Sequence, residues 1–319
     1  MKPPYSFTTK IVNLLSSISE KIGEVNAVHL NKPSPELRKR NRIRTIRASL
    51  EIEGNTLSEA QITAIVENRR VVGPKQDIKE VLNAIKVYDL IGSLDPTSME
   101  SFLRAHQILL DELIEQPGQL RTRSVGIFKG DQVAHLAPPA ANVHYLISEL
   151  FSYLKESQDH PLIKSCVVHY EIEFIHPFMD GNGRMGRLWQ TLILLKHYPI
   201  FEYLPFETVI KEHQQEYYDV LERCDRQGAS TEFIEFMLGT INEAFDDLLQ
   251  VQERRFSPKD RVRYFLDYGG LKNFTRKEYM DFYKEISSST ASRDLRGATK
   301  NGLIAKSGDK GTTTYMRIV

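Results

Sequence analysis

Cysteines are scarce in this chain: Cys166 and Cys224 are the only two among 319 residues, and they form no CxxC pair. This excludes a disulfide framework and gives no indication of a cysteine zinc site. Chains that do without disulfides are typical of reducing compartments, so the sequence predicts a cytoplasmic protein.

Long apolar runs and net charge are lacking as well. No stretch approaches the length of a membrane-spanning helix, and the N-terminal apolar run is too short and too polar for a signal peptide. Lys plus Arg and Asp plus Glu both number 42, so the formal net charge is zero at pH 7. The whole molecule therefore has no overall attraction to nucleic acid or an anionic membrane. We expect a soluble protein that is not exported.

Alternating, strand-like patterns are also scarce. Apolar residues recur at helical spacing along most of the chain, whereas residues 124–139 hold short β-prone pieces around Lys129-Gly130-Asp131. We predict a mainly α fold with one small β-hairpin. Breaks rich in Pro, Gly and Ser divide it into an N-terminal helical region (1–95), a central core (96–255) and a C-terminal domain (256–319).

What the chain does contain is a concentrated polar motif, HPFMDGNGRMGR, at residues 176–187. Helical patterns lie on both sides, so its glycine-rich turn is predicted at the start of a helix, where unpaired backbone N–H groups and the helix dipole favour an anion. Gly181 and Gly183 would let the backbone approach a phosphate closely. Arg184 and Arg187 follow three residues apart and would bind further phosphate oxygens.

Two other residues of the motif suit a reaction at phosphorus. Asp180 offers the hard oxygen ligand that Mg²⁺ needs when phosphates and water supply the rest. His176 is the side chain suited to accept a proton near neutral pH. The residues together predict a nucleotide held by its phosphates while His176 activates a hydroxyl. The motif is not a P-loop, because no GK[ST] ends it, and not a Rossmann fingerprint, because no strand precedes it.

The motif resembles the HPFx[D/E]GNGRxxR signature of the Fic family, and the similarity extends over about residues 96–250. The resemblance implies a helical core with a hairpin flap, and AMPylation, the transfer of AMP from ATP to a Ser, Thr or Tyr hydroxyl of a protein. It implies these roles: His176 as general base, Asp180 on Mg²⁺, Gly181, Asn182, Gly183 and Arg184 on the phosphates, Arg187 on the γ-phosphate, and Phe178 as a buried anchor.

The resemblance also assigns a flap and an adenine pocket. Val133, Ala134, His135 and Leu136 resemble the family segment that covers the adenine and aligns the target's backbone as an added strand. A hairpin packed only for structure is the alternative. Tyr217 resembles the tyrosine that lines the adenine pocket, whereas Asp225 stands where relatives often carry Asn.

A second, shorter pattern lies at Ser49-Leu50-Glu51-Ile52-Glu53-Gly54 and fits the family's inhibitory sequence [S/T]xxxE[G/N]. On a helix, Ser49 and Glu53 share a face and Gly54 would cap the end. The pattern predicts that Glu53 pairs with Arg187 and occupies the space that the γ-phosphate needs. In the alternative, Glu53 is solvated or pairs with a nearby arginine, namely Arg42, Arg44 or Arg47.

The C-terminal residues resemble a winged helix-turn-helix. Helices are predicted at 260–267, 276–284 and 289–300, followed by a hairpin around 308–311. Such a domain could bind DNA through the helix that carries Arg293, Arg296 and Lys300. Because the basic density is modest, docking or dimer contact is favoured over DNA binding.

Three hypotheses of function follow. The first is an autoinhibited protein adenylyltransferase that uses ATP and Mg²⁺ and modifies a target protein and itself. In the second, the same site removes AMP, with Glu53 orienting a water molecule. The third is a DNA-binding regulator whose core senses a nucleotide without turnover. A homodimer is left open, and no membrane partner is expected.

Overall fold

The computed structural model describes residues 3–27, 35–129, 132–253, 258–268, 271, 273–283, 286–308 and 313–318. The chain packs into two compact units, Met1–Asp247 and Leu248–Val319. The domain boundary predicted at 255/256 lies outside the described residues, and the one predicted at 95/96 stays a prediction. In the described part of the chain, no helix is both long and apolar enough to cross a membrane.

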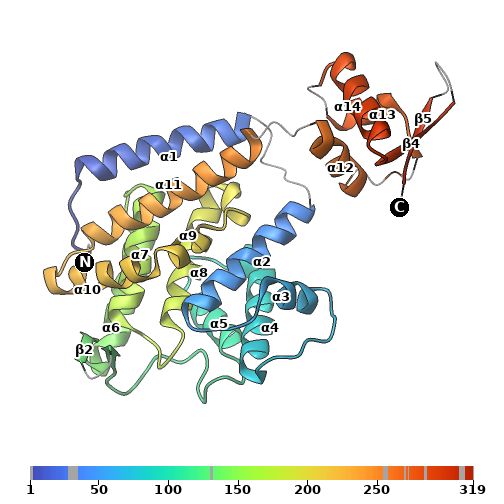
Figure 1. The fold of residues 1–319 in the computed structure, drawn as a ribbon. Coiled ribbons are helices and arrows are strands. Elements are labelled where there is room, and N and C mark those ends of the chain that lie inside the picture. The colour runs from blue at the N-terminus through green and yellow to red at the C-terminus, as the bar shows by residue number, and fades with distance from the viewer. Residues whose placement is uncertain are drawn as a thin grey trace. The chain divides into compact units, whose positions relative to one another are not determined.

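The first unit is mainly helical and carries a small hairpin, which confirms the predicted fold class (Figure 1). The helix α11, which ends the first unit, extends to Glu253, whereas the boundary between the units follows Asp247. In chain order the elements are α1 (Thr9–Ala27), α2 (Pro35–Ile52), α3 (Glu59–Val66), α4 (Lys75–Leu90), the 3₁₀ helix η1 (Ile91–Ser93), α5 (Met99–Leu109), β1 (Gly126–Lys129), β2 (Gln132–Leu136), α6 (Ala140–Glu156), α7 (Pro161–Ile175), α8 (Asn182–His197), the 3₁₀ helix η2 (Pro199–Glu202), α9 (Phe206–Glu212), α10 (Gln214–Gln227) and α11 (Thr231–Glu253).

Helices α7 and α8 form the centre of this unit. Most residues of α7 are buried, and α8 is buried without interruption from Arg184 to Leu194. A helix that lacks a polar face must be enclosed by other elements: α6 packs against α7, while α2 and η2 pack against α8. The loop of residues 176–181 therefore runs between two fixed helices.

Aromatic side chains pack against the loop of residues 176–181 and hold it in place. The fully buried Phe178 ring lies 5.2 Å from Phe102 between ring centres, and Phe102 lies 5.0 Å from Trp189. The His106 ring stacks on Phe178 at 3.6 Å. Phe178 is thus the buried anchor that the sequence indicated.

Helices α1 and α11 run side by side along one edge of the first unit (Figure 1). Thr8 Oγ1 donates to Glu235 at 2.6 Å, and Lys21 forms an ion pair with Asp246. These contacts join the start of the chain to residues more than two hundred positions later.

Helix α2 is fixed along its length before it reaches the central pair. Asn41 Nδ2 donates to the backbone oxygen of Tyr203 at 2.8 Å, and Thr45 Oγ1 donates to the buried Glu207 at 3.3 Å. Its last turn lies against α8, where Ser49 contacts Arg187. The position of residues 49–54 therefore depends on the packing of the whole helix.

Strands β1 and β2 form the predicted antiparallel hairpin. Gly126 pairs with Leu136 and Lys129 with Gln132, and the register shifts between Ile127 and Phe128. This shift is a β-bulge on the β2 side, because the partners of those two residues, His135 and Val133, are two positions apart. The turn predicted at Gly130-Asp131 lies outside the described residues.

In its described residues, the second unit holds the end of α11, three further helices and a small sheet. Its elements are α12 (Pro258–Tyr268), β3 (Asn273–Phe274), α13 (Arg276–Phe282), α14 (Ser288–Lys300), β4 (Ile304–Ser307) and β5 (Thr314–Arg317), and the antiparallel sheet has the order β3-β5-β4. This is the element order expected for a winged helix-turn-helix, and each helix differs from its predicted span by only one or two residues at either end.

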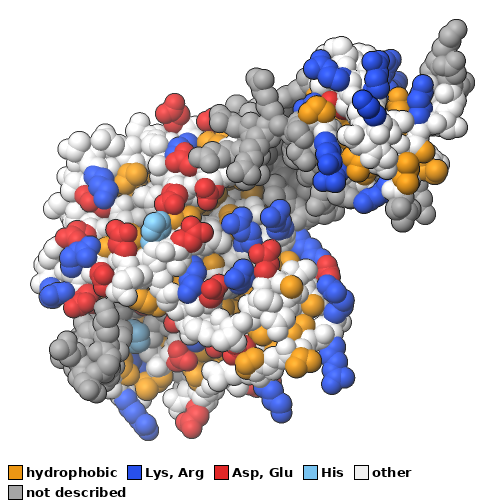
Figure 2. Space-filling view, in the orientation of Figure 1, with side chains coloured by type: hydrophobic (Ala, Val, Ile, Leu, Met, Phe, Trp, Pro, Cys, Tyr) orange, Lys and Arg blue, Asp and Glu red, His pale blue; other side chains and the backbone are white. Residues whose placement is uncertain are grey.

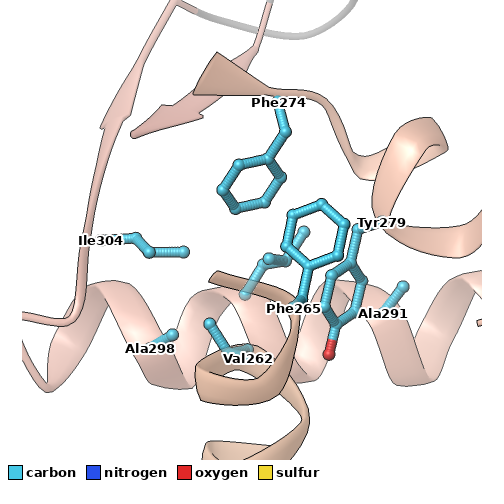
Figure 3. Close-up of a cluster of buried hydrophobic side chains, with 8 residues drawn as sticks. Val262, Phe265, Phe274, Tyr279, Ala291, Ala298 and Ile304 are labelled. Carbon is cyan, nitrogen blue, oxygen red and sulfur yellow. The ribbon is translucent and has the colours of Figure 1, made fainter. Parts of the chain in front are cut away.

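Helix α14 closes the core of this unit (Figure 3). Phe265 of α12, Phe274 of β3 and Tyr279 of α13 gather over its apolar face, with Phe265 and Phe274 only 4.5 Å apart between ring centres. Beneath them Asp294 is buried and receives two hydrogen bonds from Arg261, at 2.6 and 2.9 Å. This pairing satisfies a carboxylate that burial alone would disfavour.

Candidate functional site

The loop between α7 and α8 has an enforced shape. His176 ends α7 with the left-handed backbone angles φ 50° and ψ 60°, and Gly181 precedes α8 with φ 82°. The Asn182 side chain clamps the loop, because it accepts from Phe178 N at 2.9 Å and donates to Phe178 O at 3.0 Å. A histidine in a left-handed conformation is uncommon and is held here by its surroundings.

A larger residue at Gly181 would be strained. Besides its positive φ, an added Cβ would lie 2.6 Å from the Leu110 side chain. The backbone N–H groups that follow it begin α8 and have no partner within the helix. The predicted helix start, with its preference for an anion, is therefore present at Gly181 and Asn182.

Arg187 lies one helical turn further along α8 and is fully buried. Its Nη2 donates to Glu53 Oε1 at 2.6 Å and to the Ser49 carbonyl oxygen at 3.0 Å, while its Nε donates to Ser49 Oγ at 3.1 Å. The structure thus brings Ser49, Glu53 and Arg187 together. Glu53 itself lies just beyond the end of α2, in a turn closed by Gly54 at φ 94°.

The electrostatics of Arg187 depend on that contact. Burial by itself would lower the pKa of the guanidinium, but Glu53, Tyr217 and Glu173 together outweigh this effect and raise it. The remaining nitrogen, Nη1, is buried without a hydrogen-bond partner. An unpaired, buried cationic N–H is a strong attraction for a further anion.

The backbone of Gly183 faces this cation. A Cβ at Gly183 would lie 2.5 Å from Glu53 Oε1 and 3.1 Å from both Arg187 Nη1 and Glu173 Oε1. Three charged or ionisable groups therefore surround one small space next to the start of α8. Only glycine leaves that space open.

Arg184 has a different environment from Arg187. Its guanidinium pairs with Glu80 of α4 at 3.3 Å and with Asp180 at 3.2 Å, and its Nε is buried without a partner. Glu80 also accepts from Asn55 at 2.8 Å, just after the inhibitory segment. Arg184 therefore lies between the loop and the residues that follow α2.

Asp180 is the exposed acid of the loop, with 58% of its side chain accessible. Its Oδ1 accepts from Gly181 N at 2.6 Å, which turns the carboxylate toward the helix start. The described residues contain no cluster of three or more His, Cys, Asp or Glu side chains suited to a metal. One accessible carboxylate fits a Mg²⁺ ion that takes its other ligands from phosphates and water.

Two of the three arginines considered as alternative partners of Glu53 pair with other carboxylates. Arg42 pairs with Asp89 at 2.6 Å, and Arg47 lies near Glu51 and Glu59, at 3.4 and 3.7 Å. In this structure the Glu53 carboxylate forms an ion pair with Arg187.

Tyr217, which the resemblance assigns to the adenine pocket, is fully buried. Its hydroxyl lies 2.8 Å from Glu173 Oε1 and 3.0 Å from His169 Nε2. The neighbouring Tyr218 is 40% exposed and donates to Ile52 O at 3.2 Å. Strand β2, with Val133, Ala134, His135 and Leu136, lies beside α10, which carries both tyrosines. Asp225 accepts from Tyr170 at 2.9 Å.

Arg121 was not anticipated from the sequence and holds the histidine's backbone. This buried residue donates from Nε to His176 O at 2.7 Å, and from Nη2 to Pro138 O at 2.5 Å and Ile175 O at 3.2 Å. Its own N–H donates to Pro177 O at 2.8 Å. Arg121 therefore ties the end of α7 to the residues that follow the hairpin.

His176 faces the site from this fixed backbone. Its Nδ1 lies 3.4 Å from Glu173 O. A proton on Nδ1 would point at that carbonyl, which leaves Nε2 as the nitrogen that can accept a proton.

The sequence analysis also did not predict three further residues near the site: Glu173, Glu80 and His106. Burial raises the pKa of Glu173 to about 7 and lowers that of His106 to about 4. His106 contacts Asp180 O through Nε2 at 3.0 Å and accepts from Gly118 N through Nδ1 at 2.8 Å. Glu173 precedes His176 by three residues, and that spacing on one helix was the available signal.

A helical core whose central loop presents a histidine beside a helix start is the arrangement that the resemblance to the Fic family led us to expect. Residues 96–194 match the sequence model of the Fic/DOC family. The crystal structure of a Fic family protein from Desulfovibrio desulfuricans G20 is 39% identical, covers 100% of this chain and 98% of its own, and superposes with a TM-score of 0.79. The chain belongs to the Fic family.

Curated relatives carry the same family name. The protein adenylyltransferase Fic of Aedes aegypti is 30% identical over 218 residues, which is 64% of this chain and 41% of the relative. That of Drosophila mojavensis is 28% identical over 73% of this chain and 46% of the relative. This chain thus spans less than half the length of either relative. Fic-1 from C. elegans shares the fold, with a TM-score of 0.62 at 20% identity over 76% of this chain and 73% of its own.

Replacing Arg121 by Met should lower the free energy of unfolding by about 2 kcal/mol, because several buried carbonyl oxygens lose their donor. Urea unfolding measures the change. Arg123→Met, which removes the same charge from an exposed position nearby, is the control. A difference between the two variants below about 0.5 kcal/mol would contradict the anchoring role.

Proposed function

We propose that this chain is a protein adenylyltransferase, which transfers AMP from ATP to a Ser, Thr or Tyr hydroxyl of a target protein and of itself. The observation that carries the proposal is Arg187: a fully buried cation, one turn into α8, with one nitrogen unpaired and another held by a carboxylate. Such a cation beside an anion-binding helix start suits the end of a triphosphate. The name of the insect relatives, protein adenylyltransferase, supports the same activity.

The start of α8 would bind the phosphates. Backbone N–H groups of Gly181, Asn182 and Gly183 would meet the α- and β-phosphate oxygens, and Arg184 would add a charged contact. Arg187 would bind the γ-phosphate and so fix where the α-phosphate lies. Asp180 would hold Mg²⁺, which neutralises phosphate charge when bound.

His176 would then act on the incoming hydroxyl. Its Nε2 accepts the hydroxyl proton while the hydroxyl oxygen bonds to the α-phosphorus and the bond to the pyrophosphate oxygen breaks. The products are the AMP ester and pyrophosphate. The left-handed backbone of His176 and the Arg121 contacts supply the rigidity that such alignment needs.

The hairpin would present the target. In the described residues, β1 and β2 pair only with each other, so β2 keeps an edge that an extended peptide can join. Val133, Ala134, His135 and Leu136 would form this edge and cover the adenine, and Tyr217 would support the pocket from beneath.

Glu53 would keep the enzyme inactive. Its carboxylate bonds Arg187 at 2.6 Å and lies beside Gly183, in the space that the γ-phosphate would enter. Ser49 strengthens the contact through two further hydrogen bonds.

The proposal includes a cytoplasmic location. The two buried cysteines form no disulfide, which suits a reducing compartment.

The C-terminal unit has a charge pattern that favours a second role, binding to duplex DNA. Residues 248–319 hold 15 Lys and Arg against 8 Asp and Glu, so the zero net charge of the chain combines +7 in this unit with −7 in the first. In Figure 2, the charged side chains visible on this unit are mostly Lys and Arg. On α14, Ser289, Arg293, Arg296 and Lys300 are exposed at helical spacing and form one basic stripe. A stripe of this kind suits a phosphate backbone.

Glu53→Gly should raise self-modification with α-labelled ATP at least about tenfold, because Arg187 becomes available to the γ-phosphate. Adding Arg187→Ala should remove the label again. Glu51→Gly is the matched control: Glu51 lies on the same last turn but pairs with Arg47 and Lys211. Equal labelling of the Glu53 and Glu51 variants would show that Glu53 is not the brake. Release of AMP from a modified target by the unaltered protein would favour AMP removal instead.

The triple change Arg293→Ala, Arg296→Ala and Lys300→Ala should weaken DNA binding by the full-length protein and reduce the salt dependence of log K by about 2 to 3, one counterion for each lost phosphate contact. A salt series of fluorescence anisotropy with a duplex measures this. The control removes three exposed charges from other faces, Lys259, Arg263 and Lys277. Equal losses in both triple variants, or no binding at low salt, would exclude the stripe as a DNA surface.

A further inference from the structure

The end of α2, directly before Glu53, is held by residues to which the proposed reaction gives no role. A helix leaves its last four carbonyl oxygens without a partner inside the helix. The carbonyl oxygens of Leu50 and Glu51 accept from the backbone amides of the turn at residues 53–55. The carbonyl oxygen of Ile52, the last residue of α2, instead receives its donors from another helix.

Two side chains of α10 donate to the Ile52 carbonyl oxygen. Gln214 Nε2 lies 2.9 Å from it, and the Tyr218 hydroxyl lies 3.2 Å from it. Gln214 and Tyr218 are four positions apart and therefore share one face of α10. Gln214 Nε2 also donates to the Tyr218 hydroxyl oxygen at 3.3 Å. Because a carbonyl oxygen has two lone pairs, it can accept both bonds at once.

The orientation of the Gln214 amide is fixed by Lys211. Lys211 Nζ donates to Gln214 Oε1 at 2.6 Å. An ammonium group can only donate, so the amide oxygen faces Lys211 and the NH₂ group faces Ile52. Lys211 Nζ also lies 4.0 Å from Glu51 Oε1, on the last turn of α2. Residues of α9 and α10 thus hold the end of α2 from one side.

The far end of the same turn is anchored by α4. Asn55 Nδ2 donates to Glu80 Oε2 at 2.8 Å and to the backbone oxygen of Asp77 at 3.1 Å. Glu53 and Gly54 therefore lie between two fixed points, one on α10 and one on α4. These two anchors set the position of the Glu53 backbone, from which its carboxylate reaches the buried guanidinium.

We infer that Gln214 and Tyr218 form a latch: they are positioning residues that keep Glu53 against Arg187 by holding the carbonyl oxygen of Ile52. The inference rests on the proposed function, because it concerns the inhibition that Glu53 would exert. Since Glu53 follows Ile52 directly, its backbone cannot shift away from Arg187 while that carbonyl group is held.

The latch is the weaker of the two anchors. Tyr218 is 40% exposed and Gln214 is half-buried, whereas Asn55 is buried. Water can replace a partly exposed donor at the Ile52 carbonyl oxygen, but it has less access to the α4 anchor. The turn at residues 53–55 should therefore open from its α10 side, with the α4 side as the fixed end.

The test uses the full-length protein with two latch variants. Gln214→Glu keeps the shape of the side chain but places an acceptor where a donor faced Ile52, and Tyr218→Phe removes one hydroxyl. Each should speed amide hydrogen exchange at residues 53–55 about fivefold, the usual contribution of one hydrogen bond. Self-modification with α-labelled ATP should rise by a similar factor, because the inhibited state becomes less populated.

Gln215→Glu is the matched control. It makes the same chemical change one position along α10, where the side chain is exposed and donates to Asp219 at 2.7 Å. Its exchange and its labelling should equal those of the unaltered protein. Exchange in α8 is followed in all variants, since a general loss of stability would speed exchange there as well.

The Glu53→Gly background tests whether the latch acts through Glu53. In that background neither Gln214→Glu nor Tyr218→Phe should raise labelling further, because the group they position is absent. A residue that acted on the transfer step itself would change labelling in both backgrounds. This comparison separates positioning of the inhibitory residue from a direct effect on catalysis.

Each outcome decides between the proposals. The latch is overturned by exchange at residues 53–55 equal to that of the Gln215 variant, by faster exchange in α8 as well, or by an equal rise in labelling in the Glu53→Gly background. It is also overturned if exchange rises without labelling while Glu53→Gly is labelled. Faster exchange confined to residues 53–55, with no label on any variant including Glu53→Gly, overturns the enzyme activity and leaves the latch in place.

Discussion

The structure depends on one ion pair, the fully buried Arg187 with Glu53, whose side chain is 32% exposed. A guanidinium that is fully removed from solvent is strongly disfavoured without an anion, so this contact stabilises the fold. The partner comes from 134 residues earlier in the chain, which requires α2 to lie along α9 and α8. Much of the first unit therefore serves to bring one carboxylate to one cation.

The rest of the site is built around the same cation. Gly183 leaves room for the anion, Asn182 clamps the loop through Phe178, and the left-handed His176 is held by Arg121. Each of these residues acts mainly on geometry. Rigid placement is what a transfer between two bound groups requires, because small displacements of the reacting atoms are costly.

The sequence predicted the parts that follow local rules. Helical spacing predicted the mainly α fold, and glycines within a polar motif predicted the turn and helix start at residues 181–183. The short pattern at Ser49 and Glu53 predicted the contact with Arg187, although Glu53 lies one residue beyond the helix on which it was expected. Residues close together in the sequence determine these features, so a sequence pattern can predict them.

The sequence analysis did not predict other residues of the site, because no pattern in the adjacent sequence distinguishes them. Arg121 is one arginine in a connecting segment, and its value comes from carbonyl groups that the fold brings to it from 17 to 55 residues away. His106 of α5 contacts the backbone oxygen of Asp180 in the loop, and Glu80 of α4 pairs with Arg184 of α8. The assignment of Tyr217 to an adenine pocket stays a prediction; in the structure its hydroxyl contacts His169 and Glu173 on α7. Residues whose role is set by tertiary contacts have no local pattern to read.

In the proposed mechanism, the inhibitory residue and the nucleotide compete for one cation. Glu53 would block the site and also satisfy Arg187, whose burial makes an unpaired state costly. A triphosphate that replaces Glu53 would have to satisfy Arg187 equally well, and its extra negative charge would be offset by the α8 helix start and by Mg²⁺ on Asp180. Under this proposal, inhibition and activity are two occupancies of the same space, and their balance depends on the difference between two anions at one guanidinium.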